Sequence, residues 1–439
     1  MDYQESLAYL EELNTFGSKL GLSRIQRLLE LLEEPQNRYR TVHVTGTNGK
    51  GSTSVMISGI LARSGIHTGL YISPHLVSYT ERIQIDGQPI SEQNFSYCLS
   101  TVRAFVDLMV AEGEESPTQF EVLTAVAFLY FAIKHVDYAV IEVGLGGLLD
   151  STNVILPEVS VITNVTFEHA DRCGGTLAGI AHHKAGIIKE GVPVITAASG
   201  EALTIIEQTA HEKNADLFVA GRDFSSSFMK FDGRMQHLEF TSELLGVAKE
   251  PYALQLLGAH QVENSSLAVM TAQLLHNLDS RITSESIGQA LELTMWPGRF
   301  ERMDIEKQQI IIDGAHNPAG MVSLRQSLDF YFPTQERVFL LGILKDKDIE
   351  SMLQILLRPN DTVVVTAPNS DRASDPEVVA KKIRTQHVEV QQDPEEALER
   401  VLELANEERL LCIAGSLYLI GGMRQKLLVR REKRKGEGL

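Results

Sequence analysis

Short β-branched runs alternate with longer helical patterns along this chain, and this alternation limits the possible folds more than any other feature. In the first half the runs are RTVHVTG (40–46), HTGLYIS (67–73), VDYAVIEVG (136–144) and VSVITNV (159–165). The helical stretch PTQFEVLTAVAFLYFAIKH (117–135) lies between the second and the third. Strands that alternate with helices form a mostly parallel, doubly wound sheet. We therefore expect an α/β domain with a phosphate loop after its first strand.

The second half repeats this pattern and predicts another, smaller α/β domain of the Rossmann-like kind. Its runs are QQIIIDG (308–314), RVFLLGIL (337–344), DTVVVTAP (361–368) and LLCIAGS (410–416). Trp296, the single tryptophan, stands beside Pro297 and Gly298, which together interrupt a helix and mark a hinge. We place the domains at 1–297 and 298–439. Residues from roughly 220 to 256 alternate apolar and polar side chains, which predicts antiparallel strands added to the first domain.

Composition excludes several classes of protein. The chain has 439 residues, 43% hydrophobic and 22% charged, which is typical of a globular protein of two or three domains. No stretch approaches the roughly 20 apolar residues of a membrane span, and the acidic start differs from a signal peptide. We therefore expect a cytoplasmic protein without a membrane partner. The net charge of −18 argues against nucleic-acid binding. The basic run 424–435 is expected to be a solvated C-terminal helix.

The three cysteines, Cys98, Cys173 and Cys412, are far apart and include no CxxC pair. This spacing indicates neither a disulfide framework nor a thiolate metal site. We expect all three to be buried, unreactive thiols.

Residues 42–53, VHVTGTNGKGST, combine a β-branched strand, a glycine-rich turn, one lysine and hydroxyls that open a helix. Glycines allow backbone N–H groups to face a phosphate, Lys50 supplies a charge, and Ser52 can ligate Mg²⁺. The general phosphate-loop pattern is met only in part, because Val44 stands at the first glycine position and Gly51 separates the lysine from the serine. A glycine-rich turn without a ligand is the alternative interpretation.

Motifs along nearly the whole chain resemble, in order, those of the folylpolyglutamate and dihydrofolate synthase family of the Mur ligase superfamily. They are FGSKLGLSRIQRLLELL, GTNGKGS, YISPHLVSYTERIQIDG, PTQFEVLTA, EVGLGG, GAHQVENSSLA, WPGRFE, DGAHN, LKDKD and AGSLYLIG. The resemblance implies a two-domain ligase that binds ATP between its domains, with L-glutamate and a folate or dihydropteroate carboxylate nearby. It also implies that the phosphate loop holds ATP through Thr47, Asn48, Gly49, Lys50, Gly51 and Ser52.

A magnesium site is expected where neighbouring strands end. Ser52 follows the first strand, Ser73 the second, Glu142 ends the third and His169 follows the fourth. Ligands bind at this edge of doubly wound sheets, and Mg²⁺ prefers oxygen ligands. In the family, the serine of SPHL, the glutamate of EVGLGG and the histidine after ITNV are metal ligands. A solvated carboxylate at Glu142 and a structural histidine at His169 are the alternatives.

HKAGIIKEGVP resembles the family segment whose lysine is carbamylated and binds a second Mg²⁺. Here that lysine is Lys184, and an ordinary lysine that pairs with ATP is the alternative. Three residues depart from the family pattern: His183 replaces a glutamate, Leu148 an arginine and Glu168 an aspartate. Because of these three departures, the resemblance determines the substrate less firmly than it determines the fold. The adjacent His182 and His183 do not predict a further metal site, because no cysteine or third histidine accompanies them.

The second domain places polar residues after its own strands, on one expected edge that faces the first domain. These residues are Asp313, His316, Lys345, Asp346, Arg372 and Ser416. Cations and hydroxyls suit the two carboxylates of glutamate, which predicts substrate binding by Arg82, His316, Lys345 and Ser416. By resemblance, Asn264, Arg299 and Asp313 bind ATP, with Arg299 on the phosphates and Asp313 near the ribose. The expected catalytic residues are Lys50, Lys184, His316 and Asp313. Surface or hinge salt bridges are the alternative for the second-domain residues and Arg82.

The predicted activity is an ATP-dependent amide ligation that adds L-glutamate to reduced folates, and in a second activity to dihydropteroate, through an acyl phosphate. We expect a monomer with two Mg²⁺ ions. A ligase that adds amino acids to UDP-muramyl peptides would need a further N-terminal domain, but only about 40 residues precede the phosphate loop. A nucleotide-binding regulator without turnover remains the non-enzymatic alternative. The sequence leaves open which folate is preferred, how long the glutamate chain grows and whether the enzyme has one activity or both.

Overall fold

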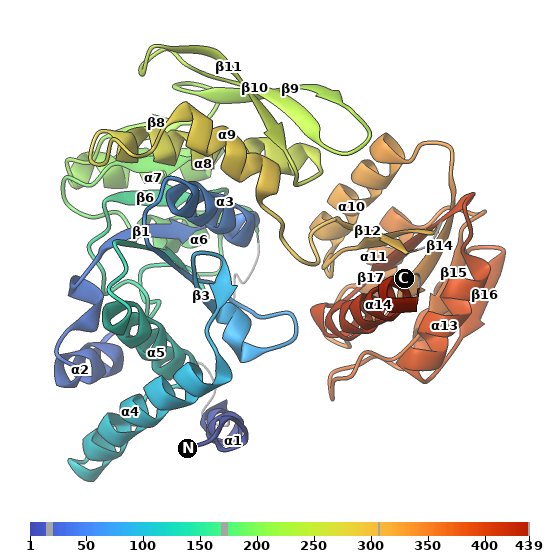
Figure 1. Ribbon diagram of the computed structural model, residues 1–439, viewed down its shortest axis with the longest axis horizontal. Helices are drawn as coiled ribbons and strands as arrows, with labels where there is room; N and C mark the ends of the chain where they lie inside the picture. Colours follow the sequence, from blue (N-terminus) through green and yellow to red (C-terminus); the bar gives the residue numbers. More distant parts are fainter. Residues whose placement is uncertain (15–20, 168–173, 306–307, 438–439) are drawn as a thin grey trace. The chain divides into compact units, whose positions relative to one another are not determined.

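A computed structural model describes residues 1–14, 21–167, 174–305 and 308–437, which form two compact units (Figure 1). The first unit comprises residues 1–255 and 261–294, and the second comprises residues 256–260 and 295–439. The short segment 256–260 therefore belongs to the second unit although the first unit surrounds it in sequence.

The first unit contains the expected doubly wound sheet, in the order β4-β3-β2-β5-β1-β6-β7-β8. The bounds are β1 (Arg40–Thr45), β2 (Thr68–Tyr71), β3 (Ile83–Ile85), β4 (Gln88–Pro89), β5 (Tyr138–Glu142), β6 (Val159–Ile162), β7 (Val194–Thr196) and β8 (Leu217–Val219). All pairs from β2 to β8 are parallel, while β3 and β4 pair antiparallel at one edge. The predicted fold class is confirmed.

Helices lie before, between and after these strands along the chain. They are α1 (Tyr3–Asn14), α2 (Ser23–Leu31), α3 (Lys50–Arg63), α4 (Glu92–Ala111), α5 (Gln119–Ile133), α6 (Leu177–Ala185), α7 (Gly200–Glu212), α8 (Ala259–His276) and α9 (Ser284–Leu293). Helix α5 shows why they form: Thr118 and Glu121 make a reciprocal capping box at its start. Its apolar side chains surround the axis, so the helix is buried in the core with α4.

The predicted antiparallel strands form a separate sheet of order β11-β10-β9. Its strands are β9 (Ser225–Phe231), β10 (Gln236–Ser242) and β11 (Val247–Leu254). In β10 every second side chain is buried, from Gln236 to Ser242, which matches the period of two in the sequence. Figure 1 shows this sheet beside α8 and α9, and β11 contacts α9.

The second unit is built on a sheet of order β12-β13-β17-β14-β15-β16 (Figure 1). Its strands are β12 (Glu301–Ile305), β13 (Gln308–Ile312), β14 (Glu336–Leu341), β15 (Thr362–Val365), β16 (His387–Val390) and β17 (Arg409–Ala414), and only β12 is antiparallel among these described strands. Its helices are α10 (Pro318–Tyr331), α11 (Ile349–Leu356), α12 (Pro376–Ala380), α13 (Pro394–Leu404) and α14 (Leu417–Glu437). The basic run lies in α14, as expected.

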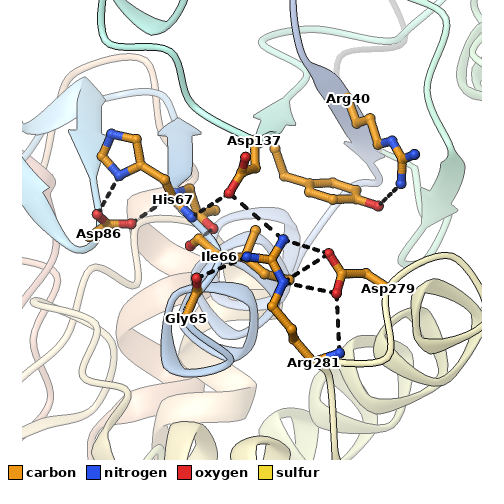
Figure 2. Close-up of polar contacts among 10 residues, drawn as sticks. Arg40, Gly65, Ile66, His67, Asp86, Asp137, Asp279 and Arg281 are labelled. Carbon is orange, nitrogen blue, oxygen red and sulfur yellow. Dashed lines mark hydrogen bonds and ion pairs between the residues drawn. The ribbon is translucent and has the colours of Figure 1, made fainter.

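An exposed polar network lies at the amino ends of the first unit's strands (Figure 2). Arg281 pairs with Asp279 at 2.7 Å and donates to the Gly65 carbonyl oxygen at 3.2 Å. His67 contacts Asp86 at 2.7 Å. Exposed ion pairs contribute little stability each, so the network mainly joins the α8–α9 and α3–β2 loops. It lies at the edge opposite to the predicted ligand edge.

Two cysteine predictions are confirmed, because Cys98 and Cys412 are buried. Burial raises the pKa of the Cys98 thiol to about 12, so the reactive thiolate is scarce. Cys173 lies outside the described residues. Among the helices that the structure describes, none combines the length and the apolar character of a membrane span.

Candidate active site

The phosphate loop between β1 and α3 requires glycine at two positions. Gly49 has φ +85°, and a Cβ atom there would lie 2.3 Å from the Asn264 Oδ1 atom. A Cβ atom on Gly46 would lie 1.8 Å from the Thr163 Oγ1 atom. The backbone is therefore held close to its neighbours, at the N-terminus of α3, where N–H groups and the helix dipole favour an anion. This arrangement fits the phosphates of ATP.

A second loop, directly after β6, holds the phosphate loop in place. The Asn164 side chain accepts a hydrogen bond from the Asn48 N–H at 2.9 Å, and its carbonyl accepts one from the Thr47 N–H at 2.9 Å. The Thr163 hydroxyl donates to the Asn48 carbonyl at 2.6 Å. The sequence analysis did not select Thr163 or Asn164. Their position directly after β6, the strand beside β1, could have indicated that they contact the phosphate loop.

Lys50 and Ser52 are also positioned by local contacts. The Lys50 ammonium donates to the carbonyls of Gly46 at 2.9 Å and Thr47 at 3.1 Å, so it lies over the loop. The buried Ser52 hydroxyl accepts from the Gln261 side chain at 3.2 Å. Gln261 in turn accepts from Asn264 at 3.0 Å. Gln261 was missed in the sequence, although its spacing of three from Asn264 places both on one helix face.

Glu142 and Ser73 meet at the carboxyl edge of the sheet. Glu142 is 4% exposed, and its carboxylate accepts from the Ser73 N–H at 3.1 Å. Glu142 is in register with Val44 of β1, the strand that leads into the phosphate loop. Carboxylate and hydroxyl oxygens, which Glu142 and Ser73 both carry, are donors that Mg²⁺ prefers. These residues therefore fit the ion.

The remaining predicted metal ligands are placed only in part. His169 and Glu168 lie outside the described residues. Lys184 is buried near the end of α6. In the described part of the chain, no group of three or more His, Cys, Asp or Glu side chains comes together.

The turn after Glu142 lies against the end of α6. The Leu148 N–H donates to the His183 carbonyl at 2.7 Å, and a Cβ atom on Gly147 would lie 2.7 Å from the same oxygen. Two of the unusual residues, Leu148 and His183, are thus joined through their backbones. This contact does not depend on their side chains, so the substitutions are compatible with the local fold.

The segment after Ser73 carries Arg82. The Arg82 Nε–H donates to His75 Nδ1 at 2.9 Å, and the guanidinium lies 5.2 Å from the centre of the Tyr79 ring. Burial and, secondarily, the Arg82 charge lower the pKa of His75 to about 4. The imidazole is therefore neutral near pH 7 and accepts this hydrogen bond. The Glu81 carboxylate accepts backbone N–H bonds at residues 76–78, which holds the segment in a compact turn.

In the second unit, Asp313 joins the WPGRF and DGAHN segments. Its carboxylate accepts from the Phe300 N–H at 2.7 Å and the Ala315 N–H at 2.8 Å. Burial raises the pKa of Asp313, and the nearby Arg299 charge opposes this effect. The Gly314 N–H also donates to the Gly298 carbonyl at 2.7 Å. Arg299 and Asp313 are therefore brought near each other.

His316 and Ser416 follow neighbouring strands, β13 and β17. The His316 Nδ1 atom lies 2.7 Å from the Gly314 carbonyl oxygen, so this nitrogen carries the proton in the neutral ring. The buried Ser416 hydroxyl accepts from the Leu419 N–H at 3.1 Å. A backbone bond from the Gly415 N–H to the Ala315 carbonyl, at 3.0 Å, joins the two loops.

Lys345, Asp346 and Arg372 form a third group at the carboxyl ends of β14 and β15. The Lys345 N–H donates to the Arg372 carbonyl at 2.8 Å, and the Lys345 ammonium to the Asp371 carbonyl at 3.3 Å. The Arg372 guanidinium lies 2.8 Å from Asp346 and lowers the pKa of that carboxyl. The predicted residues of the second unit therefore occupy one edge of its sheet.

Comparison with known proteins identifies the family of both domains. Residues 44–272 match the Mur ligase middle domain, and residues 298–417 match the glutamate ligase domain of Mur ligases. The fold and the phosphate site thus define a Mur ligase, an ATP-dependent enzyme that forms carbon–nitrogen bonds. Within this class, the chain belongs to the folylpolyglutamate synthase and dihydrofolate synthase family.

Relatives and solved structures support this family assignment over almost the full chain. The dihydrofolate synthase/folylpolyglutamate synthase of Bacillus subtilis is 32% identical, over 97% of this chain and 99% of the relative. The folylpolyglutamate synthase of Lacticaseibacillus casei is 36% identical, over 98% and 99%. The crystal structure of the Thermotoga maritima folylpolyglutamate synthase has a TM-score of 0.87 and 36% identity, over 97% and 96%. The Mycobacterium tuberculosis enzyme, complexed with ADP and AMPPCP, has a TM-score of 0.85 and 31% identity, over 97% and 99%.

Proposed function

We propose that this chain joins L-glutamate to the carboxylate of a reduced folate, with ATP and Mg²⁺, and that it also accepts dihydropteroate. The observation that carries the proposal is the phosphate loop, with Ser52 held by Gln261, beside the buried Glu142 at the end of the adjacent strand. Amide formation from a carboxylate is unfavourable in water, so the acceptor is first phosphorylated to an acyl phosphate. Bound ATP supplies this phosphoryl group, and Mg²⁺ neutralises its oxygens.

The first unit supplies the groups for phosphoryl transfer. We assign the N–H groups of residues 47–52 and the Lys50 ammonium to the ATP phosphates, and Asn264 to the nucleotide. Ser52, Ser73, Glu142 and His169 are proposed as Mg²⁺ ligands. The contact between Ser73 and Glu142 supports this set, since it keeps two of its members side by side.

Lys184 is proposed as a carbamylated lysine that holds a second Mg²⁺. A carbamate turns a cationic side chain into an anionic oxygen donor, which suits a hard metal ion. Lys184 is buried, so a carbamate on this lysine would be shielded from bulk water. The backbone contact of the neighbouring His183 with Leu148 links the segment to the turn that follows Glu142.

The second unit is proposed to bind glutamate and part of ATP. Its Arg299 would contact the phosphates and Asp313 the ribose. His316, Lys345 and Ser416, together with Arg82 of the first unit, would bind the two glutamate carboxylates. We accordingly assign residues 1–297 to ATP binding and 298–439 to glutamate binding. We further propose a cytoplasmic monomer that binds neither membranes nor nucleic acid.

The test is a reaction of purified protein with ATP, Mg²⁺, L-glutamate and tetrahydrofolate, followed by mass spectrometry. We expect products heavier by whole glutamyl units, with one ADP and one phosphate per unit. A parallel reaction with dihydropteroate tests the second acceptor independently. Other amino acids should not be added to the acceptor. An amino acid without the second carboxylate leaves polar groups of the site unpaired, which makes the free energy of binding less favourable by about 1–3 kcal/mol or more.

Two controls make this test specific. Glu142→Gln keeps the size of the side chain but removes its charge, so it should abolish most product formation. Nucleotide binding without glutamyl addition to either pterin acceptor would refute the ligase proposal. It would instead favour a nucleotide-binding regulator, the alternative that Leu148, Glu168 and His183 suggested from the sequence.

A further inference from the structure

A histidine is buried in the centre of the main sheet and joins a chain of hydrogen bonds. His43 of β1 is 0% exposed and is flanked by Ile141 of β5 and Ser160 of β6. Its Nε2 atom lies 2.9 Å from the Thr152 hydroxyl oxygen. The Thr152 hydroxyl donates to the buried Asp150 carboxylate at 2.6 Å.

The direction of these bonds follows from the number of protons. A threonine hydroxyl has one hydrogen, and Asp150 accepts it, so the oxygen must accept from His43. The neutral His43 ring therefore carries its proton on Nε2. Burial and the Lys189 charge lower the pKa of His43 to about 3, so the ring is neutral near pH 7. The Nδ1 atom has no partner among the described residues.

Folding alone does not account for a histidine at this place. A buried acceptor without a partner costs about 1–3 kcal/mol, whereas the β-branched residues around His43 suit a central strand. A polar residue that breaks a locally consistent strand pattern is expected at functional sites. The bonds beyond Thr152 indicate what this function is.

Asp150 closes the turn that follows Glu142. Its carboxylate accepts from the Leu145 N–H at 2.8 Å, and its own N–H donates to the Gly147 carbonyl at 3.1 Å. The Thr45 hydroxyl, at the end of β1, donates to the Gly146 carbonyl at 2.7 Å. The turn 143–150 is thus tied to β1 through Thr45, through the bond from the Val143 N–H to the Val44 carbonyl at 2.9 Å and, by way of Thr152, through His43.

The other side of the same turn contacts the helix that carries Lys184. Besides the bond from the Leu148 N–H to the His183 carbonyl, the Asn153 side chain donates to the carbonyls of Leu148 and Gly186, both at 3.0 Å. A continuous path of hydrogen bonds therefore runs from β1, through the turn after Glu142, to the end of α6.

We propose that His43 is a positioning residue: acting through Thr152 and Asp150, it fixes the turn 143–150 and so the places of Glu142 and Lys184 for metal binding. This inference rests on the proposed metal roles of these two residues. His43 contacts neither substrate nor metal in this arrangement. It acts by orienting groups that do, as outer partners of metal ligands commonly do.

The test uses paired substitutions that separate the hydrogen bond from the volume of the side chain. His43→Gln places an N–H donor the same number of bonds from the backbone as Nε2, whereas His43→Leu removes the donor and keeps an apolar side chain. Thr152→Ser keeps the hydroxyl, and Thr152→Val removes it. Mn²⁺ replaces Mg²⁺ as a spectroscopic probe, and its affinity is measured by electron paramagnetic resonance in the presence of AMPPCP. Melting temperature and kcat are recorded for each variant.

We expect His43→Leu and Thr152→Val to weaken Mn²⁺ binding at least ~10-fold, the effect typical of lost outer partners of metal ligands. kcat should fall in parallel. His43→Gln and Thr152→Ser should remain within roughly 3-fold of the original protein. The affinity for AMPPCP in the presence of EDTA should not change in any variant. A change in melting temperature alone, with unchanged Mn²⁺ affinity, would mean that His43 is only structural and would overturn the inference.

The outcomes also separate this inference from the proposed function. If the original protein binds Mn²⁺ with AMPPCP and His43→Leu binds it equally well, the positioning role is wrong and the ligase proposal stands. If the original protein binds no Mn²⁺ and adds no glutamate, both proposals fail. Should His43→Leu not fold, the pair Thr152→Ser and Thr152→Val decides the question, because those changes are smaller and act on the same hydrogen bond.

Discussion

Replacing Gly49 with alanine would add a methyl group where the phosphate loop approaches Asn264 of α8. Gly49 has φ +85°, and its Cβ atom would lie 2.3 Å from the Asn264 Oδ1 atom and 3.0 Å from the Asn264 Cγ atom. Contacts this short do not occur in folded proteins, so the Asn264 side chain would have to move. Its hydrogen bond to the buried Gln261 would then be lost.

The expected loss of stability has two parts. An L-residue in the left-handed region costs about 1–2 kcal/mol. A buried acceptor left unpaired on Gln261 adds about 1–3 kcal/mol. The sum is about 2–5 kcal/mol, which corresponds to a fall in melting temperature of about 4–10 °C for a unit of this size. AMPPCP affinity should also fall by at least ~10-fold, because Asn264 and the loop backbone are both proposed to contact the nucleotide.

Gly65 provides a matched control. It also has a left-handed backbone, with φ +75°, but no described atom outside its immediate chain neighbours lies within 4 Å of its ideal Cβ position. Gly65→Ala should therefore carry only the backbone cost of about 1–2 kcal/mol and leave AMPPCP affinity unchanged. Adding Asn264→Ala to Gly49→Ala should lower the melting temperature little further, because the hydrogen bond from Asn264 to Gln261 is already lost in the single variant.

Differential scanning calorimetry without ligand measures the melting temperatures, and isothermal titration calorimetry measures AMPPCP binding. The reasoning is refuted if Gly49→Ala and Gly65→Ala lower the melting temperature equally and both bind AMPPCP normally. That result would mean that Asn264 does not approach the phosphate loop as closely as the structure indicates.

Three further predictions concern turnover and pH. Lys50→Ala and Glu142→Gln should each lower turnover at least ~100-fold, about 2.7 kcal/mol of transition-state stabilisation, with nearly unchanged melting; near-normal glutamate-dependent ADP production would contradict the phosphate and metal roles. Lys184→Ala should have low activity, and short carboxylic acids should partly restore it. The intact mass of gently handled original protein should show an added carboxyl group that acid treatment removes. Normal activity of Lys184→Ala without added carboxylic acid would exclude a metal-bridging lysine. Arg325 lowers the pKa of Asp329, so this carboxylate stabilises the fold above its unfolded pKa of about 4, and the contribution is lost as pH falls through its folded pKa. Asp329→Asn should therefore lower the melting temperature at pH 7 and lose this effect in strong acid; an equal difference at both pH values would contradict it.

Several features of the fold follow from short-range sequence patterns. The β-branched runs predicted β1, β2, β5 and β6, and the period of two predicted β9 to β11, because each pattern is complete within one strand. The phosphate loop was equally readable, since its glycines, lysine and serine act within one strand-to-helix turn. Strands β7 and β8, of three residues each, are too short to show a period and were not predicted.

Predictions for single site residues depended on the family resemblance more than on local pattern. The sequence placed Ser73 and Glu142 at one sheet edge because parallel strands end together, and the bond between them agrees with that placement. Asp313 and Arg299 are also near each other, and the resemblance assigns both to ATP. Their chemical roles remain predictions until the proposed reactions are measured.

By itself, then, the sequence determined the class of fold, the phosphate loop and the sheet edges that carry polar residues, because these depend on periodicity and turn chemistry within a few residues. Only the tertiary structure decided which distant segments support them. Asn164 holds the phosphate loop from 116 positions away from Asn48, and His43 reaches Asp150 through Thr152, 109 positions along the chain. Such contacts arise when the sheet closes and buried polar groups must find partners, and no local pattern in the sequence specifies them.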